Sequence, residues 1–175
     1  MSHPHNKIVI WRHGQTDWNI ANRFQGSTDI PLNETGLSQV KRAGKLLTGL
    51  SPTQIISSDL SRAYSTAKAL ADLVGLEIKK DHRLRETDGG NWEGKTGDAI
   101  RETDIENFIR WIDGDDNPAG DVGERRSDVA ARATAAIYEA LAGKTNQTLV
   151  VATHGGTARC IIGSMLNLPM NTWGS

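Results

Sequence analysis

Short apolar runs alternate along the chain with longer segments in which apolar residues recur at helical spacing. Runs that are rich in β-branched residues and bounded by polar residues or glycine predict buried strands at residues 8–11, 54–57 and 148–152. The longer segments predict helices at residues 33–47, 59–74 and 128–142. Strands that alternate with helices indicate an α/β fold with a mostly parallel central sheet.

Residues that favour helix ends support this division of the chain. Asn33 is suited to cap the start of the first predicted helix, and Gly75 and Gly143 are suited to end the other two. Residues 113–123 are rich in Asp, Gly and Pro, which predicts a solvated loop. No internal repeat interrupts the pattern, so residues 1–175 are expected to form a single domain.

Composition narrows the classes of protein that the chain can represent. The hydrophobic content of 37%, the charged content of 23% and a formal net charge of −1 are typical of a globular protein. Because no long basic run is present, neither nucleic acid nor a membrane surface is expected as a partner. The single cysteine, Cys160, excludes an intramolecular disulfide and lies in an apolar stretch, where burial is expected. A cytoplasmic protein is predicted.

Cationic residues follow all three predicted strands. Arg12 and His13 follow the first, Arg62 follows the second in the first turn of a helix opened by Asp59, and His154 follows the third. In open parallel sheets, ligands bind beyond the carboxyl ends of the strands. If the three strands are neighbours, two arginines and two histidines converge on one site that suits a tetrahedral dianion.

The glycines and histidines near this site indicate which reaction it could support. Gly14, Gly155 and Gly156 would let backbone N–H groups approach an anion closely. A neutral imidazole can attack phosphorus while a second histidine and the arginines stabilise the equatorial oxygens. The leaving alkoxide then needs a proton, from a carboxylic acid or a histidine. No convincing metal-ligand cluster is present in the sequence.

The segment Arg12-His13-Gly14-Gln15-Thr16, followed by Asn19, resembles the signature of the histidine phosphatase superfamily, also called phosphoglycerate mutase-like. Further motifs in the same order occupy residues 23–26, 29–36, 57–63, 84–86, 92–94 and 153–156. The resemblance implies a three-layer α/β/α sandwich and an enzyme that needs neither metal nor cofactor.

The resemblance also implies roles for individual residues. His13 would carry the phosphoryl group, and Glu86 would donate the proton to the leaving group. The phosphate pocket would be completed by Arg12, Asn19, Gln25, Gly26, Arg62, His154 and the backbone of Gly155. Without the resemblance, Glu86 could equally form surface ion pairs with its charged neighbours, Arg83 and Arg85.

A second motif points to a different class of protein. Residues 89–96 satisfy the Walker A pattern of nucleotide-binding loops. The preceding residues 82–88 are too charged for a buried strand, and Gly97 is not expected to begin a helix. Glu93 would also place negative charge against bound phosphates. A surface turn is the preferred interpretation.

The resemblance favours hydrolysis of a small phosphomonoester. The chain is compact between Glu86 and His154, where mutases usually carry insertions, so a cofactor-dependent phosphoglycerate mutase is the alternative. A non-catalytic phosphate-binding module is disfavoured because both the nucleophile and the acid are present. Within the phosphatase branch the chain resembles actinobacterial glucosyl-3-phosphoglycerate phosphatases. Candidate substrates are therefore glucosyl-3-phosphoglycerate or another sugar or glycerate phosphate.

Two departures from the family pattern affect these expectations. The loop that borders the substrate pocket usually reads Gly-Gly-Glu-Ser, but residues 122–125 read Val-Gly-Glu-Arg, which leaves the leaving group open. Trp18, Phe24 and Trp111 are candidates to shape its pocket, although Trp18 could equally belong to the core. Family members usually continue with another strand after the last helix, so a C-terminal segment beyond Ser175 is expected. A homodimer is compatible with the resemblance.

Overall fold

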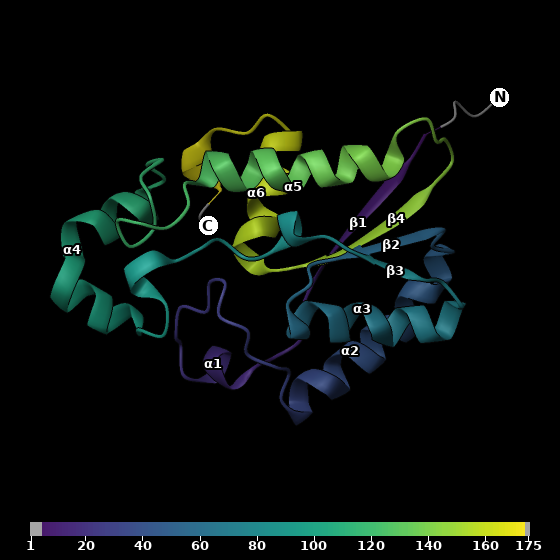
Figure 1. Ribbon diagram of the computed structural model, residues 1–175, viewed down its shortest axis with the longest axis horizontal. Coiled ribbons are helices and arrows are strands. Elements are labelled where there is room, and N and C mark those ends of the chain that lie inside the picture. Colours follow the sequence, from purple (N-terminus) through teal and green to yellow (C-terminus); the bar gives the residue numbers. More distant parts are fainter. Residues whose placement is uncertain (1–4, 174–175) are drawn as a thin grey trace.

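A computed structural model describes residues 5–173, in which a parallel sheet of four strands lies between two layers of helices (Figure 1). The strands are β1 (Lys7–Arg12), β2 (Gln54–Ser57), β3 (Ile78–Lys80) and β4 (Thr148–Thr153). Their order in the sheet is β1-β4-β2-β3, and every pairing is parallel. The predicted α/β/α fold with a mostly parallel sheet is confirmed.

The central strand β4 explains why the predicted strand ends meet. All six of its residues are buried, and it pairs with β1 on one side and with β2 on the other. Ala152 is the register partner of both Trp11 and Ser57. The chain segments that follow β1, β2 and β4 therefore leave the same edge of the sheet side by side.

The α-helices of the described residues are α1 (Asp17–Ile20), α2 (Glu34–Leu47), α3 (Ser61–Val74), α4 (Gly97–Asp113), α5 (Arg126–Leu141) and α6 (Gly155–Met165). Short 3₁₀ helices lie at η1 (Thr48–Leu50), η2 (His82–Leu84), η3 (Gly90–Trp92) and η4 (Met170–Thr172). None of the helices within residues 5–173 combines the length and the apolar character that crossing a membrane requires.

Alternating strand residues pack against the two helical layers. Leu149 and Val151 of β4 join a core cluster with α5 and α6, whereas Val150 and Ala152 join a cluster with α3. Figure 1 shows α5 and α6 on one side of the sheet and α2 and α3 on the other. This arrangement explains why β1, β2 and β4 contain continuous apolar runs rather than alternating apolar and polar residues.

Most of the predicted helix ends are confirmed. The Asn33 side chain caps α2 by accepting a hydrogen bond from Gly36 N at 2.9 Å. Gly75 ends α3 in the left-handed conformation with φ 68°, a conformation that glycine adopts without steric cost. The helix predicted at 128–142 spans Arg126–Leu141, and Gly143 follows it with φ 69°.

Two expectations were wrong, and one strand was not predicted. Asp59 does not open the helix after β2, because α3 begins at Ser61 and the Asp29 carboxylate accepts hydrogen bonds from the Ser61 backbone and hydroxyl. β3 was missed because two of its three residues are lysines. A helix does begin at Gly97, because the Thr96 side chain caps it by accepting from Ala99 N at 3.2 Å.

Helix α4 stands apart from the sheet. Its backbone is kinked at Asp104, and in Figure 1 it lies beyond the end of the sheet that the strands point toward. Its residues Ile100 and Phe108 pack with the fully buried Trp92 in a small apolar cluster of their own. The loop predicted at 113–123 follows α4 and connects it to α5.

Candidate active site

A cavity of about 410 Å³ opens beyond the carboxyl ends of the strands. Most of the predicted site residues line it, namely Arg12, His13, Asn19, Gln25, Gly26, Arg62, Glu86 and Gly155. His154, which is fully buried, is the exception and lies behind the cavity wall. The predicted convergence of residues from separate strand ends is therefore seen in the structure.

His13 presents one ring nitrogen as a nucleophile. Its Nδ1 lies 2.7 Å from Gly14 O, and since a carbonyl oxygen can only accept, Nδ1 carries the proton. Nε2 is then left with a free lone pair. Burial lowers the pKa of His13 to about 4, and the nearby guanidinium groups of Arg62 and Arg12 act in the same direction. The imidazole is consequently neutral near pH 7, the form that can attack phosphorus.

Arg62 is a fully buried cation at the wall of the cavity. Its Nη1 donates to Thr28 O at 2.7 Å and its Nη2 donates to Gly26 O at 2.8 Å. Each terminal nitrogen retains a second N–H group. The two backbone contacts fix the plane of the guanidinium, and the remaining donors are available to an anion in the cavity.

His154 uses both ring nitrogens inside the protein. Arg62 Nε donates to its Nδ1 at 3.2 Å, so the proton of the neutral ring resides on Nε2, which donates to Ser58 Oγ at 2.9 Å. Burial, followed by the charge of Arg62, holds its pKa well below the ordinary value. The rings of His154 and His13 lie with their centroids 5.2 Å apart. In this arrangement His154 orients Arg62, and its direct contact with phosphoryl oxygens stays a prediction of the resemblance.

Arg12 and Gly155 supply donors that no protein group uses. The Arg12 side chain has neither a hydrogen bond nor an ion pair with the described residues 5–173, and it lies over Gly155, where an added Cβ would be 3.4 Å from Arg12 Nε. Gly155 N, at the first position of α6, has no acceptor within the same range. Gly14 and Gly156 differ from expectation, because their N–H groups donate to Thr66 Oγ1 and Glu86 Oε2.

The amides of Asn19 and Gln25 are both oriented by Thr16, a residue that the motif contained but to which sequence reasoning gave no role. Thr16 N donates to Asn19 Oδ1 at 2.9 Å, and Thr16 Oγ1 donates to Gln25 Oε1 at 3.0 Å. Because both carbonyl oxygens face Thr16, both NH₂ groups are directed away from it. These groups are suited to donate to an anion in the cavity that Asn19 and Gln25 line.

Glu86 lies at the N-terminus of α6 rather than in surface ion pairs. Its Oε1 accepts from Thr157 N at 2.9 Å and its Oε2 accepts from Gly156 N at 3.0 Å. The neighbouring arginines have other partners, since Arg85 pairs with Asp59 and Arg83 with acidic residues of β3–η2 and α5. The surface-pair interpretation is wrong, and the carboxyl group lines the cavity.

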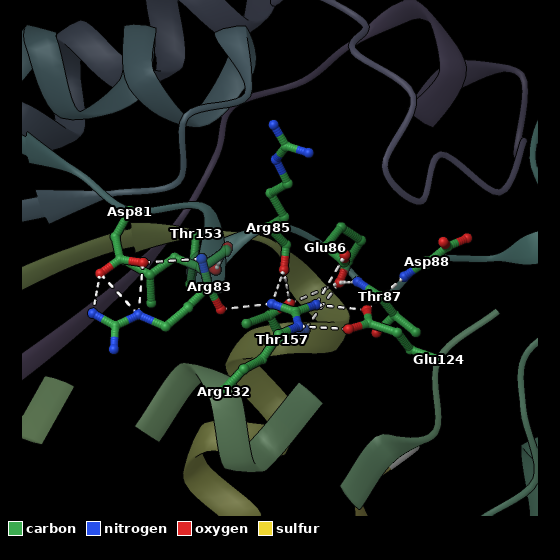
Figure 2. Close-up of polar contacts among 11 residues, drawn as sticks. Asp81, Arg83, Arg85, Glu86, Thr87, Asp88, Glu124, Arg132, Thr153 and Thr157 are labelled. Carbon is green, nitrogen blue, oxygen red and sulfur yellow. Dashed lines mark hydrogen bonds and ion pairs between the residues drawn. The ribbon is translucent and has the colours of Figure 1, made fainter. Parts of the chain in front are cut away.

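Arg132 of α5 holds the segment that carries Glu86 (Figure 2). Its guanidinium donates to the carbonyl oxygens of Arg83, Arg85 and Glu86 at distances of 2.6, 2.9 and 3.2 Å. The same guanidinium is paired with Glu124 at 2.7 Å. One side chain from a helix thus fixes an irregular stretch of backbone, which no spacing in the sequence could have indicated.

The Walker A match does not form a phosphate cradle. The segment follows the turn of η2 and an irregular stretch instead of a strand. The Glu93 carboxylate accepts hydrogen bonds from Ser27 N, Thr28 N and Gly89 N, so it fills the space that a phosphate would need. The segment is not a simple surface turn either, because it contains the 3₁₀ helix η3 and the fully buried Trp92, and a helix follows it.

Aromatic side chains also line the cavity, including Phe24 and Trp111, whereas Trp18 does not line it. Cys160 also contributes to the wall; it is buried, and burial raises its pKa to about 12, as expected of an unreactive thiol. None of residues 122–125, where the chain departs from the family loop, lines the cavity. Within residues 5–173, no group of three or more His, Cys, Asp or Glu side chains is placed to hold a metal ion.

Known proteins resemble the chain over nearly its whole length. Glucosyl-3-phosphoglycerate phosphatase of Mycobacterium tuberculosis is 37% identical over 95% of this chain and 78% of its own. A crystal structure of the mycobacterial glucosyl-3-phosphoglycerate phosphatase in complex with VO3 superposes with a TM-score of 0.88, at 37% identity over 95% of this chain and 83% of that one. A probable phosphoglycerate mutase of Yersinia pestis is 32% identical over 93% of this chain and 76% of its own.

A family model covers the same region. The model of the histidine phosphatase superfamily (branch 1) matches residues 8–175, which contain every motif that carried the resemblance. The convergent strand ends, the neutral His13 and the cavity around it agree with a phosphatase that uses a histidine. The chain belongs to the histidine phosphatase superfamily, and it is a phosphatase of that family.

Proposed function

We propose that the protein hydrolyses a small phosphomonoester through a phosphohistidine formed on His13. The observation that carries this proposal is the state of His13: a neutral imidazole, with Nδ1–H bonded to Gly14 O and Nε2 unprotonated, on the wall of a cavity that Arg12 and Arg62 also line. An anionic phosphate is attracted by the arginines while the nucleophile itself carries no proton.

In the first step, Nε2 of His13 attacks phosphorus and the bond from phosphorus to the ester oxygen breaks. Glu86 enters as the carboxylic acid and transfers its proton to the departing oxygen, so the alcohol leaves neutral. Oε2 is the suitable oxygen, because it accepts one hydrogen bond, from Gly156 N, whereas Oε1 accepts from both Thr87 N and Thr157 N.

In the second step, water attacks phosphorus and the bond to Nε2 breaks. The Glu86 carboxylate takes a proton from that water, which restores the acid for the next turnover and releases inorganic phosphate. We assign the binding of the phosphoryl oxygens to Arg12, Arg62, the amides of Asn19 and Gln25, and Gly155 N. His154 is assigned to hold Arg62, and Gly26 contributes through the carbonyl oxygen that Arg62 contacts.

The substrate that we propose follows the names of the relatives. Glucosyl-3-phosphoglycerate, or another sugar or glycerate phosphate, suits a cavity of about 410 Å³ with aromatic residues in its wall. Because one relative is a probable phosphoglycerate mutase, phosphoglycerate mutase activity is the second candidate function. We further propose one domain over residues 1–175 in a cytoplasmic protein; a homodimer stays an expectation of the resemblance.

The test is a kinetic profile of the wild-type protein and the His13→Ala variant on sugar phosphates, phosphoglycerates and glucosyl-3-phosphoglycerate. Release of inorganic phosphate by the wild type alone supports the proposed function. Interconversion of 2- and 3-phosphoglycerate without phosphate release would support the mutase instead. Binding without any turnover would identify a non-catalytic module.

A further inference from the structure

Two further arginines line the cavity that His13, Arg12 and Arg62 line. Arg126, at the start of α5, and Arg159, on α6, both contribute to the cavity wall together with Trp111 and Trp173. Arg126 lies against Trp111 of α4, a helix that supplies none of the residues assigned to the phosphoryl group. This part of the wall is therefore available to the leaving group.

Arg126 is a buried cation without an ion-pair partner in the described part of the chain. Its side chain is 5% exposed, its guanidinium is 4.1 Å from the centre of the Trp111 ring, and its one hydrogen bond is a long contact of 3.4 Å from Nη1 to Asp115 O. The adjacent carboxylates are used elsewhere, since Asp115 pairs with Arg110 and Asp116 accepts from the Ser127 backbone and hydroxyl.

A buried guanidinium such as that of Arg126 destabilises the folded protein unless an anion binds to it. Removing a guanidinium from water is unfavourable, and stacking on an indole offsets only part of that penalty. Arg159 adds to the cost, because its charge opposes that of Arg126. Arg159 itself has no hydrogen bond or ion pair within residues 5–173, although it faces the same cavity.

We propose that Arg126 and Arg159 bind a second anionic group, a carboxylate or a second phosphate, on the alcohol that leaves from the phosphoryl group. This inference rests on the proposed function and narrows its substrates to phosphomonoesters with a charged leaving group. Guanidinium groups recognise carboxylates and phosphates through paired N–H donors, which gives the site direction as well as charge. The two arginines are thus assigned as specificity-determining residues, outside the group that acts on the phosphoryl oxygens.

Binding to the His13→Ala variant tests the proposal without turnover, by calorimetry with two matched pairs of ligands. 3-Phosphoglycerate and glycerol 3-phosphate differ by a carboxylate; fructose 1,6-bisphosphate and fructose 6-phosphate differ by a second phosphate. We expect the ligand with the second anion to bind about tenfold more tightly in at least one pair. The pair that shows the preference identifies the anion.

The same measurement on variants locates the site. In the His13→Ala background, Arg126→Gln and Arg159→Gln should each bring the preference close to unity. Arg125→Gln is the matched control, because Arg125 is adjacent in sequence but lies outside the cavity and donates to Asp116 O. If Arg126→Gln fails to fold, the Arg159→Gln variant alone tests the proposal, because Arg159 is exposed.

Two results would overturn the proposal: equal binding within both pairs, or a preference that survives in the folded arginine variants. Failure of the proposed function would look different. In that case the wild-type protein would release no phosphate from any of these ligands, while the variants could still show that a second anion is bound.

Discussion

The two ends of the cavity are built in different ways. At the phosphate end, the guanidinium of Arg62 is fixed by hydrogen bonds to Thr28 O and Gly26 O. At the leaving-group end, the wall comes from α4, from the start of α5, from α6 and from Trp173, and its arginines make few contacts. The residues that perform the reaction common to the family are therefore positioned by the sheet, whereas the residues that select the substrate lie on the segments around it.

If the phosphate end contains the acid, the largest effect after loss of the nucleophile should come from Glu86→Gln. We expect turnover of an unactivated ester to fall about 10³-fold, because the alkoxide must leave without a proton. Phosphate affinity should be retained, and p-nitrophenyl phosphate, whose leaving group needs no proton, should be much less affected. Steady-state kinetics with both esters measure the difference. Unchanged turnover of the unactivated ester would remove Glu86 from the mechanism.

Acid should destabilise the protein through the phosphate end, where both buried histidines lie. The folded-state pKa of His13 is about 4, below the ordinary value of 6.5, so between these values the unfolded chain binds the extra proton. Stability is therefore complete above pH 6.5 and is lost as pH falls toward 4, by about 3 kcal/mol for this group. His154 acts in the same direction.

Urea unfolding at a series of pH values between 4 and 7 measures this dependence, with His13→Asn as the comparison. The variant lacks the titrating group, so its free energy of unfolding should fall less than that of the wild type over the same range. Parallel curves for the two proteins would show that His13 is not protonated with unfolding in this range.

Arg132 connects the phosphate end to α5, so its loss should impair the acid specifically. We expect Arg132→Met to lower kcat on an unactivated ester about tenfold by releasing the backbone at Glu86, with a smaller effect on p-nitrophenyl phosphate. The effect should shrink in the Glu86→Gln background, because the two residues act on one step. Arg85→Gln, which removes only the exposed pair with Asp59, is the control. Equal losses on both esters would indicate a structural role alone.

Thr16 should show the smallest effect, since it orients donors without touching the phosphate. Thr16→Val removes the hydroxyl that contacts Gln25 and caps α1, whereas Thr16→Ser keeps it. We expect the valine variant to bind inorganic phosphate roughly fivefold more weakly and the serine variant to bind it normally. Competitive inhibition by phosphate is a suitable assay. Wild-type affinity for phosphate in the valine variant would mean that the amides of Asn19 and Gln25 are oriented without Thr16.

The same comparison explains what could be predicted from the sequence. The strands β1, β2 and β4 were visible because strands buried on both faces are continuously apolar, and the site followed because parallel strands end at one edge. α4 escaped notice because it starts at a glycine, is kinked and packs only part of one face. Arg126 and Arg132 were beyond prediction as site residues, because Arg126 contacts Trp111 of another helix and the carbonyl oxygens that Arg132 contacts are at least 46 residues away in sequence.

Trapping the phosphoryl group shows whether His13 carries it during turnover. The wild-type protein is mixed with p-nitrophenyl phosphate, quenched in alkali and digested, and the modified peptide is identified by mass spectrometry. We expect an acid-labile, alkali-stable phosphoryl group on His13 that disappears on further incubation, and none in His13→Ala. A phosphoryl group on another residue, or turnover in His13→Ala close to that of the wild type, would contradict it.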